Sequence, residues 1–142
     1  MTAARKAPYR LVAPVVPEHS LQRQICDVLR MEIAPPGKVS KAGVVWWSVD
    51  MAAYSGEVPG IRIGRGIIAG VPDVFVLHAG RSYMIEIKTD ADDARLSDAQ
   101  RSVCAAVLAS GGRVGVVRDA GETLHCLDAW QIPRARRIRG EV

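Results

Sequence analysis

The chain has little cysteine, and its three thiols are far apart, at Cys26, Cys104 and Cys126. None has a second cysteine at the short spacing of a zinc site, and an odd number does not suit a disulfide scaffold. No apolar run approaches the roughly 20 residues that a membrane-spanning helix needs. The apolar stretch 11–16 contains a proline and is too short for the core of a signal peptide. We therefore expect a soluble cytoplasmic protein without a membrane partner, in which Cys104 and Cys126 are packed thiols.

Lysine is also scarce, because fifteen of the nineteen basic residues are Arg and only four are Lys. The net charge is +4, but it is unevenly distributed. The segment from Glu86 to Asp98 contains five acidic and two basic residues, which gives it a net charge of −3. The rest of the chain therefore has a net charge of +7. Guanidinium groups match phosphate oxygens bidentately. The composition favours a phosphate-bearing partner, although a coding bias would also enrich arginine.

With 142 residues, the chain has the size of one domain that can bury a core. The predicted elements are a helix from Pro17 to the breaker at 35–37, strands at 44–49, 71–79 and 81–89, a helix at 96–110 and a strand at 113–118. The order αβββαβ predicts an α/β domain with a mixed sheet flanked by helices. Residues 121–130 are expected to form a short strand and a turn. The domain then spans 17–130, between a basic arm at 1–16 and a basic tail at 131–142.

The two central strands place two acidic residues opposite each other if they form the tightest hairpin. If Ala79-Gly80 is a two-residue turn, the residue numbers of every cross-strand pair add up to 159. This register pairs Asp73 with Glu86. Opposed Cβ atoms lie roughly 5 Å apart. Because side chains alternate along a strand, Lys88 shares the face of Glu86. The sequence therefore predicts two close carboxylates with a lysine beside them.

Two carboxylates at this distance repel each other, and a divalent cation between them removes the repulsion. Oxygen ligands select Mg²⁺, for which Mn²⁺ can substitute, over softer metals. Since Mg²⁺ keeps several waters and binds phosphate oxygens, the pair suits metal-assisted hydrolysis of phosphodiesters. Lys88 would orient or deprotonate the attacking water, or neutralise charge that develops on the phosphate. The spacing alone slightly favours a simpler explanation, in which Lys88 forms a salt bridge with Asp73 or Glu86.

Further polar residues lie near the starts of both predicted helices. Glu18 lies two turns before Ile25, on the apolar face, although a first-turn Glu is also favoured by the helix dipole. Gln22 lies close to Glu18 around the axis and is an alternative to it. In the second helix, Ser97 and Gln100 fit a capping box, while the Gln100 amide could instead lie over a metal or contact a phosphate. The sequence does not choose between these roles.

These motifs together resemble a known family. Gly-Val-Pro-Asp at 70–73, Glu-Ile-Lys at 86–88 and Leu-Ser-Asp-Ala-Gln at 96–100 are similar to the PD-(D/E)XK nuclease superfamily. More narrowly, they resemble the small stand-alone VRR-NUC domains of phages and bacteria. The resemblance covers residues 18–130, and it implies a restriction-endonuclease-like core.

The resemblance also implies roles for individual residues. Six positions match the family's site: Asp73, Glu86 and the Ile87 carbonyl as metal ligands, Lys88 as the catalytic lysine, Glu18 as a further acid at the metal, and Gln100 as the glutamine of the second helix. Family members are similar to Holliday-junction resolvases and act on branched or structured DNA. Some are homodimers, an assembly that suits symmetric cutting of both strands of a junction.

Arginines outside this region are candidates for contacts with nucleic acid. Arg62 and Arg65 lie in a glycine-rich segment, where ordinary solvated arginines are the alternative. This segment does not predict a nucleotide cofactor, because a strand follows where a phosphate-binding loop needs a helix. Four more lie in the tail, where they would add salt-sensitive affinity: Arg134, Arg136, Arg137 and Arg139.

Trp46 and Trp47 alternate faces of a predicted strand, so one lies in the core. The other fills a dimer interface or stacks on a base, and we favour the interface. Taken together, the sequence predicts an Mg²⁺-dependent endonuclease that cuts structured DNA through a metal-activated water. A DNA-binding module that no longer cuts, and a nuclease directed at RNA, are the alternatives.

Overall fold

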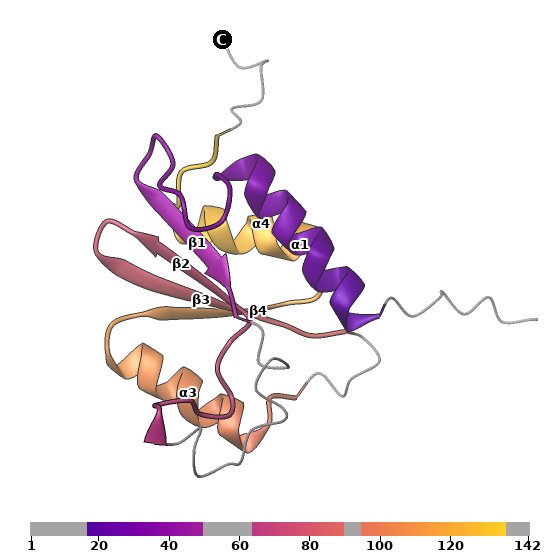
Figure 1. Ribbon diagram of the computed structural model, residues 1–142, viewed down its shortest axis with the longest axis vertical. Helices are drawn as coiled ribbons and strands as arrows, with labels where there is room; N and C mark the ends of the chain where they lie inside the picture. The colour runs from indigo at the N-terminus through magenta and orange to yellow at the C-terminus, as the bar shows by residue number, and fades with distance from the viewer. Residues whose placement is uncertain (1–16, 50–63, 90–94, 136–142) are drawn as a thin grey trace, which may run out of the picture.

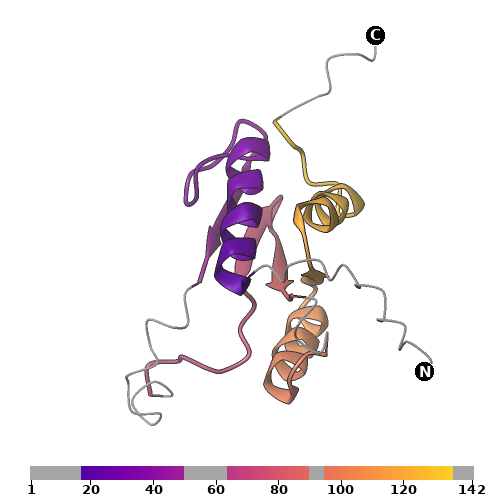
Figure 2. The ribbon, with the colours of Figure 1, turned by 90° about the vertical axis from the view of Figure 1, so that its right-hand side faces the viewer.

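Four strands form one mixed sheet, and helices lie on both of its faces. The computed structural model describes residues 17–49, 64–89 and 95–135. The elements are, in chain order, α1 (Glu18–Glu32), β1 (Val44–Ser48), β2 (Val74–His78), β3 (Arg81–Ile87), α3 (Asp98–Ala109), β4 (Arg113–Val117) and α4 (Ala120–Ala129). The strand order is β1-β2-β3-β4, and only the pair β3–β4 is parallel. Figures 1 and 2 show α1 and α4 together on one side of the sheet and α3 on the other. The predicted α/β class with a mixed sheet is confirmed.

The β2–β3 hairpin has the predicted register. Val74 faces Ile85, and every pair up to the turn sums to 159. Both turn residues have positive φ, 51° at Ala79 and 75° at Gly80. This is the type I′ geometry, whose twist matches that of the flanking strands. The hairpin therefore carries Asp73, the residue before β2, to the edge where β3 ends.

Local sequence signals account for the ends of α1 and α3. Pro17 is the N-cap of α1, and the helix ends before the breaker at 35–37, as predicted. Ser97 caps α3 and forms a capping box with Gln100. Among the helices within the described ranges, none is long and apolar enough to cross a membrane.

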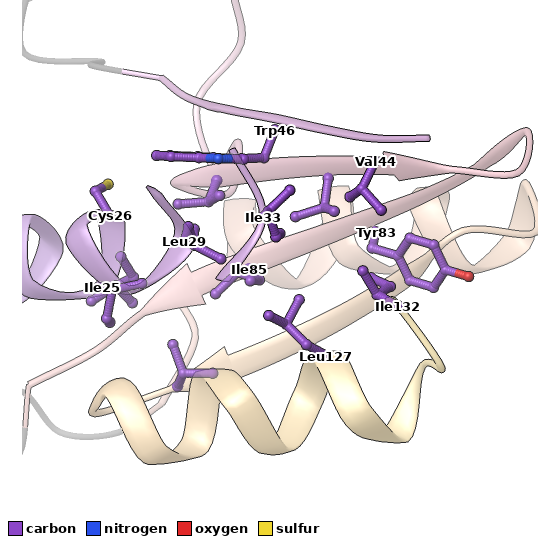
Figure 3. Close-up of a cluster of buried hydrophobic side chains, with 14 of the residues drawn as sticks. Ile25, Cys26, Leu29, Ile33, Val44, Trp46, Tyr83, Ile85, Leu127 and Ile132 are labelled. Carbon is purple, nitrogen blue, oxygen red and sulfur yellow. The ribbon is translucent and has the colours of Figure 1, made fainter. Parts of the chain in front are cut away.

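The hydrophobic core lies between the sheet and the layer formed by α1 and α4 (Figure 3). Its buried side chains come from α1, from every strand and from the C-terminal part of the chain: Leu21, Ile25, Cys26, Leu29, Ile33, Val44, Trp46, Val74, Val76, Tyr83, Ile85, Ile87, Val117, Leu127 and Ile132. On β3 the core residues alternate with residues that lie on the opposite face of the sheet. Because Ile85 and Ile87 point into the core, Glu86 points to the α3 side.

The prediction of a short strand and a turn for residues 121–130 was wrong, because α4 occupies this segment. The Asp119 side chain accepts a hydrogen bond from the N–H of Glu122 and caps the helix. Thr123 and Leu127, four residues apart, are fully buried and form the inward face. A side-chain cap followed by buried residues four positions apart is typical of a helix. This pattern outweighs the weak tendency of the segment to form a strand.

The packed domain also extends past residue 130, where the sequence placed its end. Ile132 is 3% exposed and belongs to the core. Arg134 Nε lies 3.3 Å from Asp128 Oδ1 and 3.7 Å from Glu32 Oε2. Residues 131–135 are therefore fixed against α1 and α4, while the rest of the predicted tail, at 136–142, lies outside the described residues.

The turn yields a prediction about stability. A left-handed conformation costs an alanine about 1 kcal/mol, whereas asparagine tolerates it and Asn-Gly is the preferred type I′ pair. We expect Ala79→Asn to raise the free energy of unfolding by about 0.5–1 kcal/mol, measured by urea denaturation. Gly80→Ala should lower it by about 1 kcal/mol, since it adds a second strained residue. Equal or lower stability of Ala79→Asn would contradict this account.

Candidate active site

Three polar side chains, Glu86, Lys88 and Gln100, meet between β3 and α3. Gln100 Nε2 donates to Glu86 Oε1 at 2.5 Å, and Lys88 Nζ donates to Gln100 Oε1 at 3.0 Å. Lys88 Nζ also lies 3.8 Å from Glu86 Oε1. The Glu86 residue is 4% exposed, and the Lys88 side chain is 15% exposed. The amide of Gln100 therefore links the carboxylate to the ammonium group where little water is present.

Asp73 lies at the same edge of the sheet. Its Oδ2 accepts the backbone N–H of Ile87 at 2.8 Å, and its carbonyl accepts the N–H of Val49 at 2.9 Å. Within a ladder, the N–H and C=O of one strand residue point to the same side. The Ile87 carbonyl is therefore directed toward Asp73, whereas the N–H of Lys88 points the other way, to Val117 of β4. The edge thus gathers a carboxylate on each strand and one backbone carbonyl.

Gln100 has both of the roles that its sequence context left open: it forms the capping box of α3, and its side chain contacts the charged groups of the candidate site. Its backbone N–H donates to Ser97 Oγ at 3.2 Å, and its Oε1 accepts the Ser97 N–H at 2.8 Å. The same Oε1 accepts from Lys88, while Nε2 donates to Glu86. A carbonyl oxygen has two lone pairs, so both bonds to Oε1 can form. The cap of α3 therefore fixes the amide that contacts the two charged groups.

Gly70 explains how the segment before Asp73 comes close to α3. Its φ is +86°, and an added Cβ would lie 2.4 Å from the backbone C and O of Ala99 and 2.6 Å from the N of Gln100. Only glycine allows the two backbones to approach so closely. Gly70 was expected as part of the Gly-Val-Pro-Asp motif and of the glycine-rich segment before it, and neither pattern predicts this contact with α3.

The oxygen groups at this edge fit a hard divalent cation. Mg²⁺ in proteins is usually held by one or two carboxylates, with water and phosphate oxygens as its other ligands. Asp73, Glu86 and the Ile87 carbonyl match that donor set. In residues 17–49, 64–89 and 95–135 no group of three or more His, Cys, Asp or Glu side chains could hold a metal ion. An ion here would thus take its remaining ligands from water and substrate.

The structure leaves several other predicted site residues apart from this cluster or undescribed. Glu18 is the first residue of α1, but its side chain is outside the described part. Arg65 is exposed in the segment before Gly70. Arg134 contacts acidic residues of α1 and α4. Four predicted contacts to nucleic acid lie outside the described residues: Arg62, Arg136, Arg137 and Arg139.

The two tryptophans divide between the faces of the sheet as predicted. Trp46 is 1% exposed and donates its Nε1–H to the Ala34 carbonyl at 2.7 Å. Trp47 is 38% exposed and stacks on Phe75, with ring centroids 5.9 Å apart. Phe75 was not predicted as the partner of Trp47, although the pairing of β1 with β2 places the two rings opposite each other.

The cysteines have the character of packed thiols. Burial raises the pKa of Cys26, Cys104 and Cys126, and the negative charge of Glu86 adds to the effect at Cys104. The thiolate is the nucleophilic form of cysteine. A raised pKa therefore argues against a cysteine nucleophile.

Comparisons with protein-family models, with curated proteins and with solved structures found no significant match to this chain.

The close approach at Gly70 leads to a test with a matched control. We expect Gly70→Ala to lower the free energy of unfolding by about 3 kcal/mol, because strain adds to overlap with the backbone of α3. Gly66 also has a positive φ, of +78°, but nothing lies within 4 Å of its added Cβ. Gly66→Ala should therefore cost only about 1 kcal/mol. Urea denaturation measures both, and hydrogen exchange at the Gln100 N–H should accelerate only in Gly70→Ala. Equal losses in the two variants would show that the contact with α3 carries no weight.

Proposed function

We propose that this chain is a metal-dependent endonuclease that hydrolyses phosphodiester bonds in structured or branched DNA. The observation that carries the proposal is the Glu86–Gln100–Lys88 cluster next to Asp73. Glu86 and Lys88 are bridged by one amide, with contacts of 2.5 and 3.0 Å. Two carboxylates and a lysine at one sheet edge are the groups that metal-assisted phosphodiester hydrolysis needs.

A purely structural salt bridge accounts less well for this cluster. Lys88 Nζ and Glu86 Oε1 are 3.8 Å apart, near the long limit for an ion pair. Withdrawing two charges from water costs several kcal/mol per ion, and only excellent geometry offsets this cost. Apolar residues of similar volume often serve stability as well or better. A largely buried carboxylate and lysine are therefore more readily explained by function than by stability.

Asp73 and Glu86 would hold the metal ion, with the Ile87 carbonyl as a further ligand. When bound, the ion would supply Lewis-acid stabilisation of the phosphate and a water of lowered pKa. Two features of the protein would keep the ligands in place. The Ile87 N–H fixes one oxygen of Asp73, and the Gln100 amide fixes Oε1 of Glu86. Such secondary contacts orient the ligands of a metal.

Lys88 would act on the substrate side of the site. Its ammonium group is held by the Gln100 carbonyl and is near Glu86, so its position is defined before any substrate binds. From this position it can orient the attacking water or neutralise charge on the phosphate. The Gln100 side chain hydrogen-bonds to Glu86, to Lys88 and to the N–H of Ser97, so we assign it a positioning role.

The choice of DNA rests on charge and on resemblance. A chain with net charge +4 and fifteen arginines suits a polyanion. The spacing of Gly70–Asp73, Glu86–Lys88 and Leu96–Gln100 resembles that of VRR-NUC domains in the PD-(D/E)XK superfamily. This resemblance supports branched DNA as the substrate class and a homodimer as an assembly to test.

The activity can be tested with the full chain on a four-way junction, a flap, a plain duplex and a structured RNA. We expect Mg²⁺- or Mn²⁺-dependent cleavage of the branched DNAs. Lys88→Ala and Asp73→Asn should each lower the rate by about 10²–10³-fold, because each removes a group that stabilises the transition state. Lys88→Ala should retain DNA binding, measured by fluorescence anisotropy.

Exposed residues outside the cluster provide matched controls. Lys41 lies in the loop before β1, and Asp27 pairs with Arg30 on α1. Lys41→Ala and Asp27→Asn should cut at the wild-type rate. Binding of junctions without cleavage in either metal would instead indicate a non-cleaving DNA-binding module. Cleavage of the RNA alone would indicate an RNA-directed nuclease.

The positioning role of Gln100 can be separated from its cap. We expect Gln100→Ala to slow cleavage by about 10–100-fold and to raise the Mg²⁺ concentration needed for half-maximal rate. Ser97→Ala removes the side-chain acceptor of the cap and costs about 1 kcal/mol of stability, but it keeps the Ser97 N–H that holds Gln100 Oε1. The contacts of Gln100 to Glu86 and Lys88 therefore remain possible. Ser97→Ala should thus keep a near wild-type rate and Mg²⁺ requirement. If both variants lose activity in proportion to their lost stability, Gln100 serves only the helix.

A further inference from the structure

Trp47 is an unusual residue on the surface of the sheet. Within the four described strands it is the large apolar side chain that remains exposed, at 38%. Its indole stacks on Phe75, with ring centroids 5.9 Å apart and an interplanar angle of 12°. Part of the indole surface remains accessible beside this contact. An exposed aromatic ring that is supported by a second ring is a surface on which a further planar group can stack.

The register places this indole beside the candidate active site. Trp47 faces Phe75 in the β1–β2 ladder. The N–H of Val49 donates to the Asp73 carbonyl, which continues the same pairing to the end of β1. Asp73 precedes Phe75 by two residues and is thus the diagonal neighbour of Trp47, about 7–8 Å away between backbones. Residues two apart share a face, so the indole lies on the α3 side of the sheet, as Glu86 does.

From this geometry we infer that Trp47, supported by Phe75, stacks on one unpaired base of the nucleic acid that is cut at Asp73 and Glu86. The inference rests on the proposed function and specifies its substrate. Aromatic side chains bind any base through its π-face, without sequence preference. In a continuous duplex, both faces of each base are covered by its neighbours. The platform therefore selects a strand whose base is unpaired next to the scissile phosphate, as at a flap or a single-stranded end.

A second copy of the chain is a less suitable occupant for Trp47. A stable interface buries about 800 Å² on each partner and needs a contiguous patch. The other large apolar side chains exposed in the described residues lie on α1, on α3 and in two loops: Met31, Leu108, Val39 and Ile68. On the sheet, Trp47 thus offers a single ring, which is the size of one base and much smaller than an interface.

The test measures binding of the full chain to a labelled single-stranded DNA of roughly twelve nucleotides, with no divalent cation present, so that cleavage does not enter. We expect Trp47→Leu, which keeps an apolar side chain but lacks a π-face, to weaken binding by about 10-fold. Trp47→Phe should retain most of the affinity but lose most of the quenching of tryptophan fluorescence on binding. A strand that is abasic at every position should weaken wild type by at least this factor and should affect Trp47→Leu less.

Duplex binding and a surface variant complete the design. Binding of a continuous duplex should change by less than about 2-fold in Trp47→Leu, because no base face is available there. Met31→Ala, which removes an exposed apolar side chain from α1, should bind like wild type. Thermal unfolding of each variant shows whether it is folded, and Trp47→Phe carries the fluorescence test if Trp47→Leu is unstable.

The outcomes separate this inference from the proposed function. Unchanged single-strand affinity in Trp47→Leu, or unchanged quenching in Trp47→Phe, would overturn the stacking role even if the chain cleaves DNA. A change from dimer to monomer in Trp47→Leu would assign the residue to an interface and overturn it as well. Stacking without cleavage under any metal condition would refute the nuclease and leave the base platform supported.

Discussion

The candidate site depends on one constraint, the two-residue turn between β2 and β3. Its two left-handed residues, at Ala79 and Gly80, fix the pairing of the strands. A shift of one residue would turn each side chain of a strand to the opposite face of the sheet. Glu86 would then enter the core, and Ile87 would face α3. The burial of Ile85 and the polar contacts of Glu86 therefore require the same register, and each supports the other.

The second requirement is the position of α3, which supplies Gln100. Three features place the start of this helix: the Ser97 cap, the bonds of Gln100 to the β3 side chains, and the contact of its backbone with Gly70. Each is short-range and directional. Together they place the start of the helix over the polar end of the sheet. Its inner residue Cys104 is buried nearby and responds to the charge of Glu86.

Much of this arrangement was predictable from sequence, because it follows from local rules. The alternation of side chains along β3 predicted which residues share a face of the sheet. The two-residue turn predicted the register that pairs Asp73 with Glu86. The helix over 120–129 was missed, since its apolar positions are few and its cap at Asp119 was overlooked. Gln100 could not be assigned to one role, because a capping glutamine and a site glutamine have the same sequence signature. The contact of Gly70 depends on how a loop meets a helix, which no local pattern encodes.

The chain segment from Asp73 to Gln100 contributes both Asp73 and the three members of the cluster, and it spans only 28 residues. Closing a short loop costs less conformational entropy than joining distant parts of a chain. Contacts of this kind are typical of structures that form early and quickly during folding. α1 and α4 contribute to the opposite, apolar side of the sheet. The candidate site and the hydrophobic core thus lie on separate faces of the sheet and share β3, whose alternate residues belong to one or the other.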